Sequence, residues 1–133
     1  MNRKTAREQA FILVFEKSLN LLSLEEIIEA ATEARDFEFD EDGYIKTVFG
    51  GVYDNLEVID EIIEKNLSGW KLDRISKVSL AILRLAIYEI KYMEDIPNSA
   101  AINEAVELTK KYAADGEHTF VNGVLGSVVK AEV

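Results

Sequence analysis

Apolar residues recur every three or four positions along this chain, and no segment of useful length alternates apolar and polar side chains. That spacing predicts amphipathic helices and gives no support for strands. The stretch 75–92, ISKVSLAILRLAIYEIKY, is apolar on most sides, so we expect a helix at the centre of the fold. The expected helices cover 3–20, 23–35, 43–66, 75–92, 100–114 and 118–131, with a further short turn near 70–72. The sequence therefore predicts an all-α fold, a compact bundle of about seven helices in two subbundles.

Several local patterns set the expected helix ends and contacts. Ser23 and Glu26 form a capping-box pattern at the start of the second helix. The adjacent glycines Gly50 and Gly51 interrupt a helical pattern, which indicates close approach of a neighbouring helix. Asn122-Gly123 suggests similar close packing early in the last helix. Arg84 lies inside the most apolar segment, so we expect it to pair with an acid or to extend its charged end towards water.

The length of 133 residues fits one domain, 1–133, and the acidic stretch 36–42 is the one candidate seam between subbundles. The chain has no cysteine and a single histidine, which excludes thiolate chemistry and most histidine-rich metal sites. No glycine-rich phosphate loop or paired Glu-x-x-His motif is present. We therefore expect no enzyme activity, no metal and no cofactor. No apolar run is long enough to span a membrane and no signal-peptide pattern occurs, so we expect a cytoplasmic protein.

The formal net charge of −10 is unevenly distributed along the chain. Segment 1–24 carries four basic and two acidic side chains, whereas 25–64 carries two basic and fourteen acidic ones. Segment 65–92 is again basic, with six basic and two acidic side chains. Because local potential matters more than net charge for binding phosphates, a basic patch around the amino terminus remains compatible with RNA binding. A solvated helix start beside a solvated acidic surface is the simpler interpretation of the same pattern.

Two segments carry a specific resemblance. IPNSAAINEAVELTKKYA at 96–113 and FVNGVLG at 120–126 resemble the signature of the NusB family of bacterial transcription antitermination factors. LAILRLAIYEI at 80–90 is similar to the family's central helix, and KTAREQAFILVFE from Lys4 resembles its first helix. Trp70 lies where members often carry a tryptophan. The similarity spans nearly the whole chain in the correct order.

The resemblance implies an adaptor without enzymatic activity. Family members pair with a small-subunit ribosomal protein called NusE, bind the boxA element of nascent ribosomal RNA transcripts, and act in the antitermination complex with RNA polymerase. Basic and aromatic residues suit this role, since single-stranded RNA is held by phosphate contacts and base stacking. The residues of this chain that the resemblance implies for RNA binding are Arg3, Lys4, Arg7, Phe15, Gly116, His118, Thr119 and Phe120. The residues that the resemblance implies for contact with the protein partner are Leu72, Arg74, Ile75 and Ser79.

One alternative of a different class stays open at the level of sequence. The rival hypothesis is a non-catalytic helical module that binds proteins, or a homodimer whose self-association masks the basic first helix. Such a module would not respond to RNA. Light scattering combined with an RNA titration separates these two hypotheses.

Overall fold

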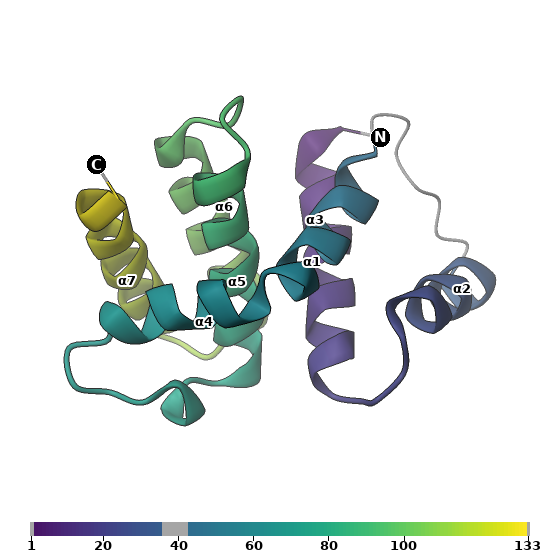
Figure 1. Cartoon of the computed structure of the whole chain (residues 1–133), viewed down its shortest axis with the longest axis horizontal. Helices are drawn as coiled ribbons and strands as arrows, with labels where there is room; N and C mark the ends of the chain where they lie inside the picture. The colour runs from purple at the N-terminus through teal and green to yellow at the C-terminus, as the bar shows by residue number, and fades with distance from the viewer. Residues whose placement is uncertain (1, 36–42, 133) are drawn as a thin grey trace.

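The computed structural model describes residues 2–35 and 43–132. Within these ranges it contains seven α-helices and one 3₁₀ turn, and no strand (Figure 1). The elements are α1 (Arg3–Ser18), α2 (Leu24–Arg35), α3 (Tyr44–Asp54), α4 (Leu56–Lys65), η1 (Leu72–Arg74), α5 (Lys77–Tyr92), α6 (Asn98–Tyr112) and α7 (Glu117–Glu132). The predicted all-α class is confirmed. The predicted seam at 36–42 lies outside the described residues.

Local capping explains where the first two helices begin. The side chain of Asn2 accepts a hydrogen bond from the backbone N–H of Thr5 at 2.8 Å, which caps α1. Ser23 Oγ accepts from the Glu26 N–H, and Glu26 Oε1 accepts from the Ser23 N–H, each at 3.1 Å. The capping box expected before α2 is therefore confirmed.

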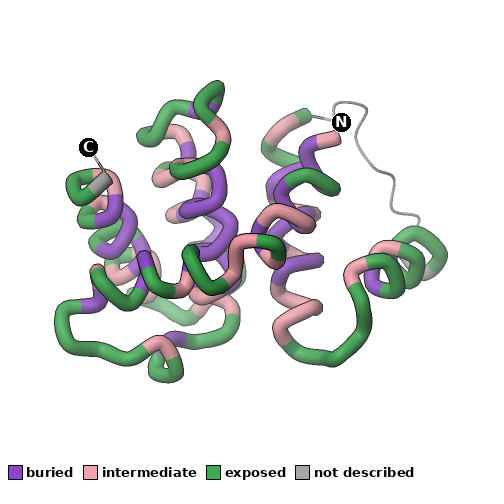
Figure 2. The backbone as a smooth tube through the Cα atoms, in the orientation of Figure 1, coloured by how far each residue is buried: buried purple, intermediate pink, exposed green. Residues whose placement is uncertain are grey.

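Helix α5 lies between two groups of helices and packs against both. It packs against α1 and α3 on one side and against α4, α6 and α7 on the other (Figure 1). Every residue from Ala81 to Glu89 is buried, and Figure 2 shows this stretch as a nearly continuous buried band. Helix α2 contrasts with it, since only Ile27 and Ala31 are buried among its described side chains. The central position predicted for the most apolar segment is confirmed.

The single long helix expected over 43–66 is wrong. The structure ends α3 at Asp54 and starts α4 at Leu56, and the chain bends between them (Figure 1). Asn55 has φ −120° and ψ 23°, and its side-chain amide donates to the Gly51 carbonyl at 2.8 Å. An asparagine side chain that bonds the local backbone competes with helix propagation. Asn55 is thus the point where the chain passes from one group of helices to the other.

The prediction of close helix packing at glycines is correct at one position and wrong at two. A Cβ built on Gly51 would overlap the ring of Tyr88, so close approach of α3 to α5 is confirmed at this position. A Cβ on Gly50 would meet nothing within 4 Å, and the same holds for Gly123. The expectation of close packing at those two glycines is wrong, because both face open space.

Arg84 is paired with an acid, which is one of the two outcomes expected for it. Its Nε and Nη2 donate to Asp60 Oδ1 and Oδ2 at 2.8 and 2.9 Å, which joins α5 to α4. Tyr53 OH donates to the Val14 carbonyl at 2.6 Å and joins α3 to α1. Burial raises the pKa of Tyr53 to about 12, so this hydroxyl stays a donor at neutral pH.

Within 2–35 and 43–132, no helix combines the length and the hydropathy needed to cross a bilayer. Over the same residues, no group of three carboxylate or imidazole side chains is arranged to hold a metal ion.

Candidate nucleic-acid interface

The basic start of α1 lies beside α6, and the two helices enclose a hollow of about 260 Å³. We call this the α1–α6 groove. Its lining mixes charges of both signs. The basic side chains are Lys4, Arg7 and Lys111, and the acidic ones are Glu8, Glu104 and Glu107. The groove is therefore not a uniformly positive surface.

Arg7 points into the protein rather than towards solvent. It is only 5% exposed, and its Nε and Nη2 donate to the Glu89 carboxylate of α5 at 2.8 to 3.2 Å. Its Nη1 lies 4.0 Å from Glu104 on α6. Although burial disfavours the charged form, the hydrogen bonds and charge of Glu89 raise the pKa of Arg7 above its ordinary value. This guanidinium joins α1 to α5 and has little surface left for a phosphate.

The other cations in the groove and at the start of α1 differ in how accessible they are. Arg3 is half-buried, and its guanidinium lies 4.4 Å from the centre of the Tyr44 ring. Lys111 donates to Glu8 at 2.6 Å, and this hydrogen bond raises its pKa. Lys4 is exposed and has no ion pair with any residue that the structure describes. Lys4 is thus the most available phosphate ligand at this end of α1.

Phe15 lies three turns further along α1. Its half-buried ring stacks on Phe11 at 6.2 Å between ring centres, and Phe11 in turn contacts Tyr112 at 5.0 Å. The contact between Phe11 and Tyr112 joins the middle of α1 to the carboxyl-terminal end of α6.

The second part of the predicted RNA surface lies where α7 begins. Gly116 has φ +90°, a value that favours glycine, and it turns the chain into α7. Gly116 and Phe120 line a hollow of about 470 Å³ together with Trp70, Arg74, Ile75, Ser76, Asp115 and Glu117. We call this the Trp70 hollow. His118 is half-buried, while Thr119 is exposed and lines an adjoining hollow of about 340 Å³.

Glu117 fixes the geometry of the Trp70 hollow. Its Oε1 accepts from Ser76 Oγ at 2.6 Å and from Ser79 Oγ at 2.7 Å, and its Oε2 accepts from the Ala114 N–H at 2.9 Å. The hydrogen bonds from Ser76 and Ser79 hold the pKa of Glu117 below its ordinary value. The start of α5 is thereby tied to the start of α7.

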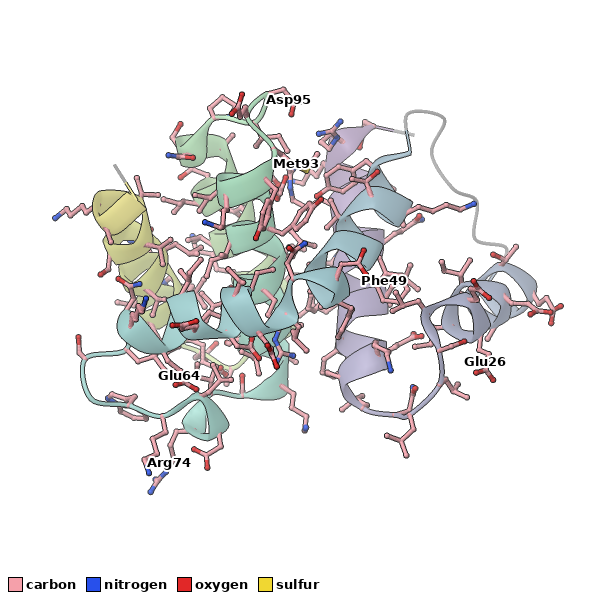
Figure 3. The ribbon with its side chains drawn as sticks, in the orientation of Figure 1. Glu26, Phe49, Glu64, Arg74, Met93 and Asp95 are labelled. Atoms are coloured by element: carbon pink, nitrogen blue, oxygen red, sulfur yellow. The ribbon has the colours of Figure 1, made fainter. Side chains whose placement is uncertain are left out.

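Two of the four residues expected to contact a protein partner, Arg74 and Ile75, line the same hollow. Arg74 is exposed and extends away from the ribbon (Figure 3), whereas Leu72 is half-buried and Ile75 is buried. Ser79 is fully buried, and its hydroxyl is engaged by Glu117. Of these four side chains, Arg74 is therefore the most accessible to a partner.

The structure thus groups the predicted residues differently from the sequence. Arg3, Lys4 and Arg7 lie at the start of α1, with Lys4 and Arg7 lining the α1–α6 groove, while Gly116 and Phe120 share a hollow with Arg74 and Ile75. Sequence reasoning missed the pairing of Glu8 with Lys111, and it noted Trp70 only through the resemblance. The signal available for Trp70 was that a lone tryptophan stands between a glycine and a lysine in a turn.

These features define an all-helical binding protein whose accessible cations and exposed aromatic rings suit a polyanion or a protein partner. Residues 4–130 match the NusB family, and the chain belongs to that family. The transcription antitermination protein NusB of Clostridium novyi (strain NT) is 49% identical over 133 residues, covering 98% of this chain and all of the relative. The protein of the same name from Acetivibrio thermocellus is 48% identical, covering all of this chain and 92% of the relative.

Solved structures show the same fold. T. maritima NusB superposes with a TM-score of 0.88 at 31% identity, covering 98% of this chain and 92% of that one. A chain from a crystal structure of the antitermination factors NusB and NusE in complex with dsRNA gives a TM-score of 0.86 at 32% identity, covering 97% and 96%. The resemblance found in the sequence is confirmed.

Proposed function

We propose that this chain is an RNA- and protein-binding adaptor in bacterial transcription antitermination. In this role it binds boxA-type single-stranded RNA of ribosomal RNA operon transcripts together with NusE, within the antitermination complex of RNA polymerase in the cytoplasm. The observation that carries the proposal is the family match over residues 4–130. A second support is the similarity at 32% identity to a chain in a structure of NusB and NusE with dsRNA. The proposed role is binding and not catalysis.

The RNA-binding residues of this proposal have unequal roles. Lys4 and Arg3 supply charge at the start of α1, and Phe120 supplies a ring beside the backbone turn at Gly116. His118 and Thr119 precede Phe120 in α7, and Phe15 supplies a further ring on α1. Arg7 acts through the fold, because its guanidinium is held by Glu89.

The protein-partner surface of the proposal is the segment from Leu72 to Ser79. Arg74 and Leu72 would make the direct contacts, while Ile75 and Ser79 hold the segment against the body of the protein. A protein bound here would lie directly beside RNA bound at Phe120, since both sets of residues border the Trp70 hollow. Joint binding of the two partners follows from that arrangement.

The test is fluorescence anisotropy with a labelled boxA RNA and a scrambled RNA of equal length, each with and without NusE. We expect boxA to bind more tightly, and more so with NusE present. Three to five phosphate contacts give a slope of about −2 to −3.5 for log K against log salt concentration. Lys4→Gln should reduce the slope by about 0.7. Lys130→Gln, which removes an exposed lysine at the far end of α7, is the matched control.

The proposal would be wrong if binding ignored both the RNA sequence and the salt concentration. Light scattering on the same samples tests the homodimer alternative. A dimer that shows no response to either RNA, even with NusE added, would favour a protein-interaction module over the adaptor.

A further inference from the structure

Trp70 is the only tryptophan of the chain, and its side chain is 60% exposed. Its position is set by a tight turn in which Ser68 and Gly69 have φ +49° and +89°, and the Trp70 N–H donates to the Leu67 carbonyl at 3.1 Å. Leu67 is buried, so the turn is anchored to the core while the indole is directed outwards. A large ring held in this way is available to a ligand.

Trp70 lines three adjoining hollows. The largest is the Trp70 hollow of about 470 Å³, which also contains Phe120. The second, of about 340 Å³, runs from Trp70 past Phe120 to Gly123, where a missing side chain leaves open space. The third, of about 320 Å³, is lined by Gly69, Trp70, Lys71 and Arg74. Two aromatic rings from distant segments thus border one continuous open surface.

The cations beside Trp70 are available, unlike Arg7 and Lys111 of the α1–α6 groove. Lys71 and Arg74 are exposed and form no ion pair with any residue that the structure describes. Figure 3 shows Arg74 extending from η1 into solvent. Arg7 and Lys111, by contrast, are held by carboxylates at 2.8 and 2.6 Å. Two exposed basic side chains without an ion pair therefore lie next to the exposed indole.

The carboxylates at this surface lie on the other wall of the Trp70 hollow. Glu117 is engaged by Ser76 and Ser79, and Asp115 precedes the turn at Gly116. A phosphate would be repelled inside the hollow but attracted to the Lys71 and Arg74 side. A nucleobase is uncharged and has an apolar face for stacking, so these carboxylates would not repel it from the hollow.

We propose that Trp70 is a base-stacking site for single-stranded RNA, with the neighbouring phosphates held by Lys71 and, when no protein partner occupies it, by Arg74. Exposed rings interleaved with unpaired cations are the combination by which proteins bind single strands. The inference rests on the proposed function and extends it, since it continues the RNA path from Phe120 onto the turn before η1. It also places RNA at the edge of the surface proposed for the protein partner.

The experiment uses the emission of Trp70, which reports on this site alone because the chain has no other tryptophan. A labelled single-stranded RNA is titrated onto the full chain, and RNA anisotropy and tryptophan emission are followed in the same samples. We expect the emission to be quenched along the same binding curve as the anisotropy. Free NusE is titrated separately, with its own emission subtracted.

Variants test the energy of the contact. Trp70→Ala should weaken RNA binding by about 5- to 150-fold, which corresponds to the 1–3 kcal/mol of one stacked base. Trp70→Phe should restore most of the affinity because it keeps an aromatic face. Lys71→Gln and Arg74→Gln should each reduce the salt slope by about 0.7, and Lys130→Gln should leave it unchanged. Circular dichroism verifies that each variant is folded.

The outcomes separate this inference from the proposed function. If RNA binds by anisotropy but the emission stays constant and Trp70→Ala binds normally, base stacking at Trp70 is refuted while the adaptor role stands. If NusE alone quenches Trp70 and RNA does not, the hollow is a protein contact and the RNA assignment is overturned. If RNA binds under none of the conditions, with or without NusE, the proposed function itself fails.

Discussion

Arg7 and Glu89 offer the sharpest test of how this fold is held together. Glu89 is fully buried and Arg7 nearly so, and the guanidinium donates three hydrogen bonds of 2.8 to 3.2 Å to the carboxylate. Arg7→Ala would remove all three and leave an uncompensated charge inside the protein. Breaking a buried pair in this way costs about 3–5 kcal/mol of unfolding free energy. That is a large share of the roughly 5–15 kcal/mol that stabilises a typical domain.

The measurement is urea denaturation followed by far-ultraviolet circular dichroism. Arg7→Lys is a milder variant that keeps the charge but loses the two-pronged geometry, so its loss should be intermediate. The double variant Arg7→Leu with Glu89→Leu should recover much of the stability, because it removes the buried charge as well as its partner. Lys65→Ala removes an exposed ion pair with Glu61 and should change stability by no more than about 0.5 kcal/mol.

A loss below about 1 kcal/mol for Arg7→Ala would refute this reasoning, since it would mean that Glu89 finds water or another partner at little cost. The result also affects RNA experiments. If Arg7→Ala is destabilised as expected, weak RNA binding by that variant reports on the fold and not on a lost phosphate contact. Lys4→Gln is the cleaner probe of the charge at this end of α1.

Three further changes have expected outcomes. Gly51→Ala should destabilise by about 1–3 kcal/mol because the new methyl group overlaps Tyr88, whereas Gly50→Ala should stabilise by about 0.5–1 kcal/mol because its site is open; urea midpoints compare the two. The pKa of Glu117 is lowered in the folded state, so its ionised form stabilises the fold. Wild type should therefore have a higher free energy of unfolding than Glu117→Gln, and this difference should be complete above the ordinary carboxyl pKa of 4.5. The difference should disappear as the pH falls through the lowered folded-state pKa. Stability curves at a series of pH values test this sign, and an advantage that grew on acidification would contradict it. Ser23→Ala should lose about 1 kcal/mol through the broken cap of α2, and an unchanged thermal midpoint would show that α2 contributes little to the cooperative unit.

The features predicted correctly from the sequence are those encoded by short-range spacing. The capping box at Ser23 and the apolar helix around Leu83 depend on residues within one or two turns of one another. The pairing of Arg84 also followed from local context, since a charge in so apolar a segment needs a partner, although the sequence did not identify Asp60.

The features that were missed depend on contacts between distant segments. Arg7 sits in a basic run, but its orientation is decided by Glu89, which is 82 residues away. The break at Asn55 was hidden because apolar spacing continues on both sides of it, so periodicity alone extended one helix through both. The grouping of Arg74 with Phe120 likewise depends on how Glu117 ties α7 to α5. No local pattern carries that information.

The position of α5 between two groups of helices has a consequence for how the protein can be divided. The bend at Asn55 looks like a natural place to cut the chain into halves. Yet a fragment that ended there would expose the faces of α1 and α3 that α5 normally covers, and the remaining piece would carry one side of α5 bare. Because neither piece retains a complete interior, we expect both fragments to be unfolded when made alone and to regain helical structure only when mixed.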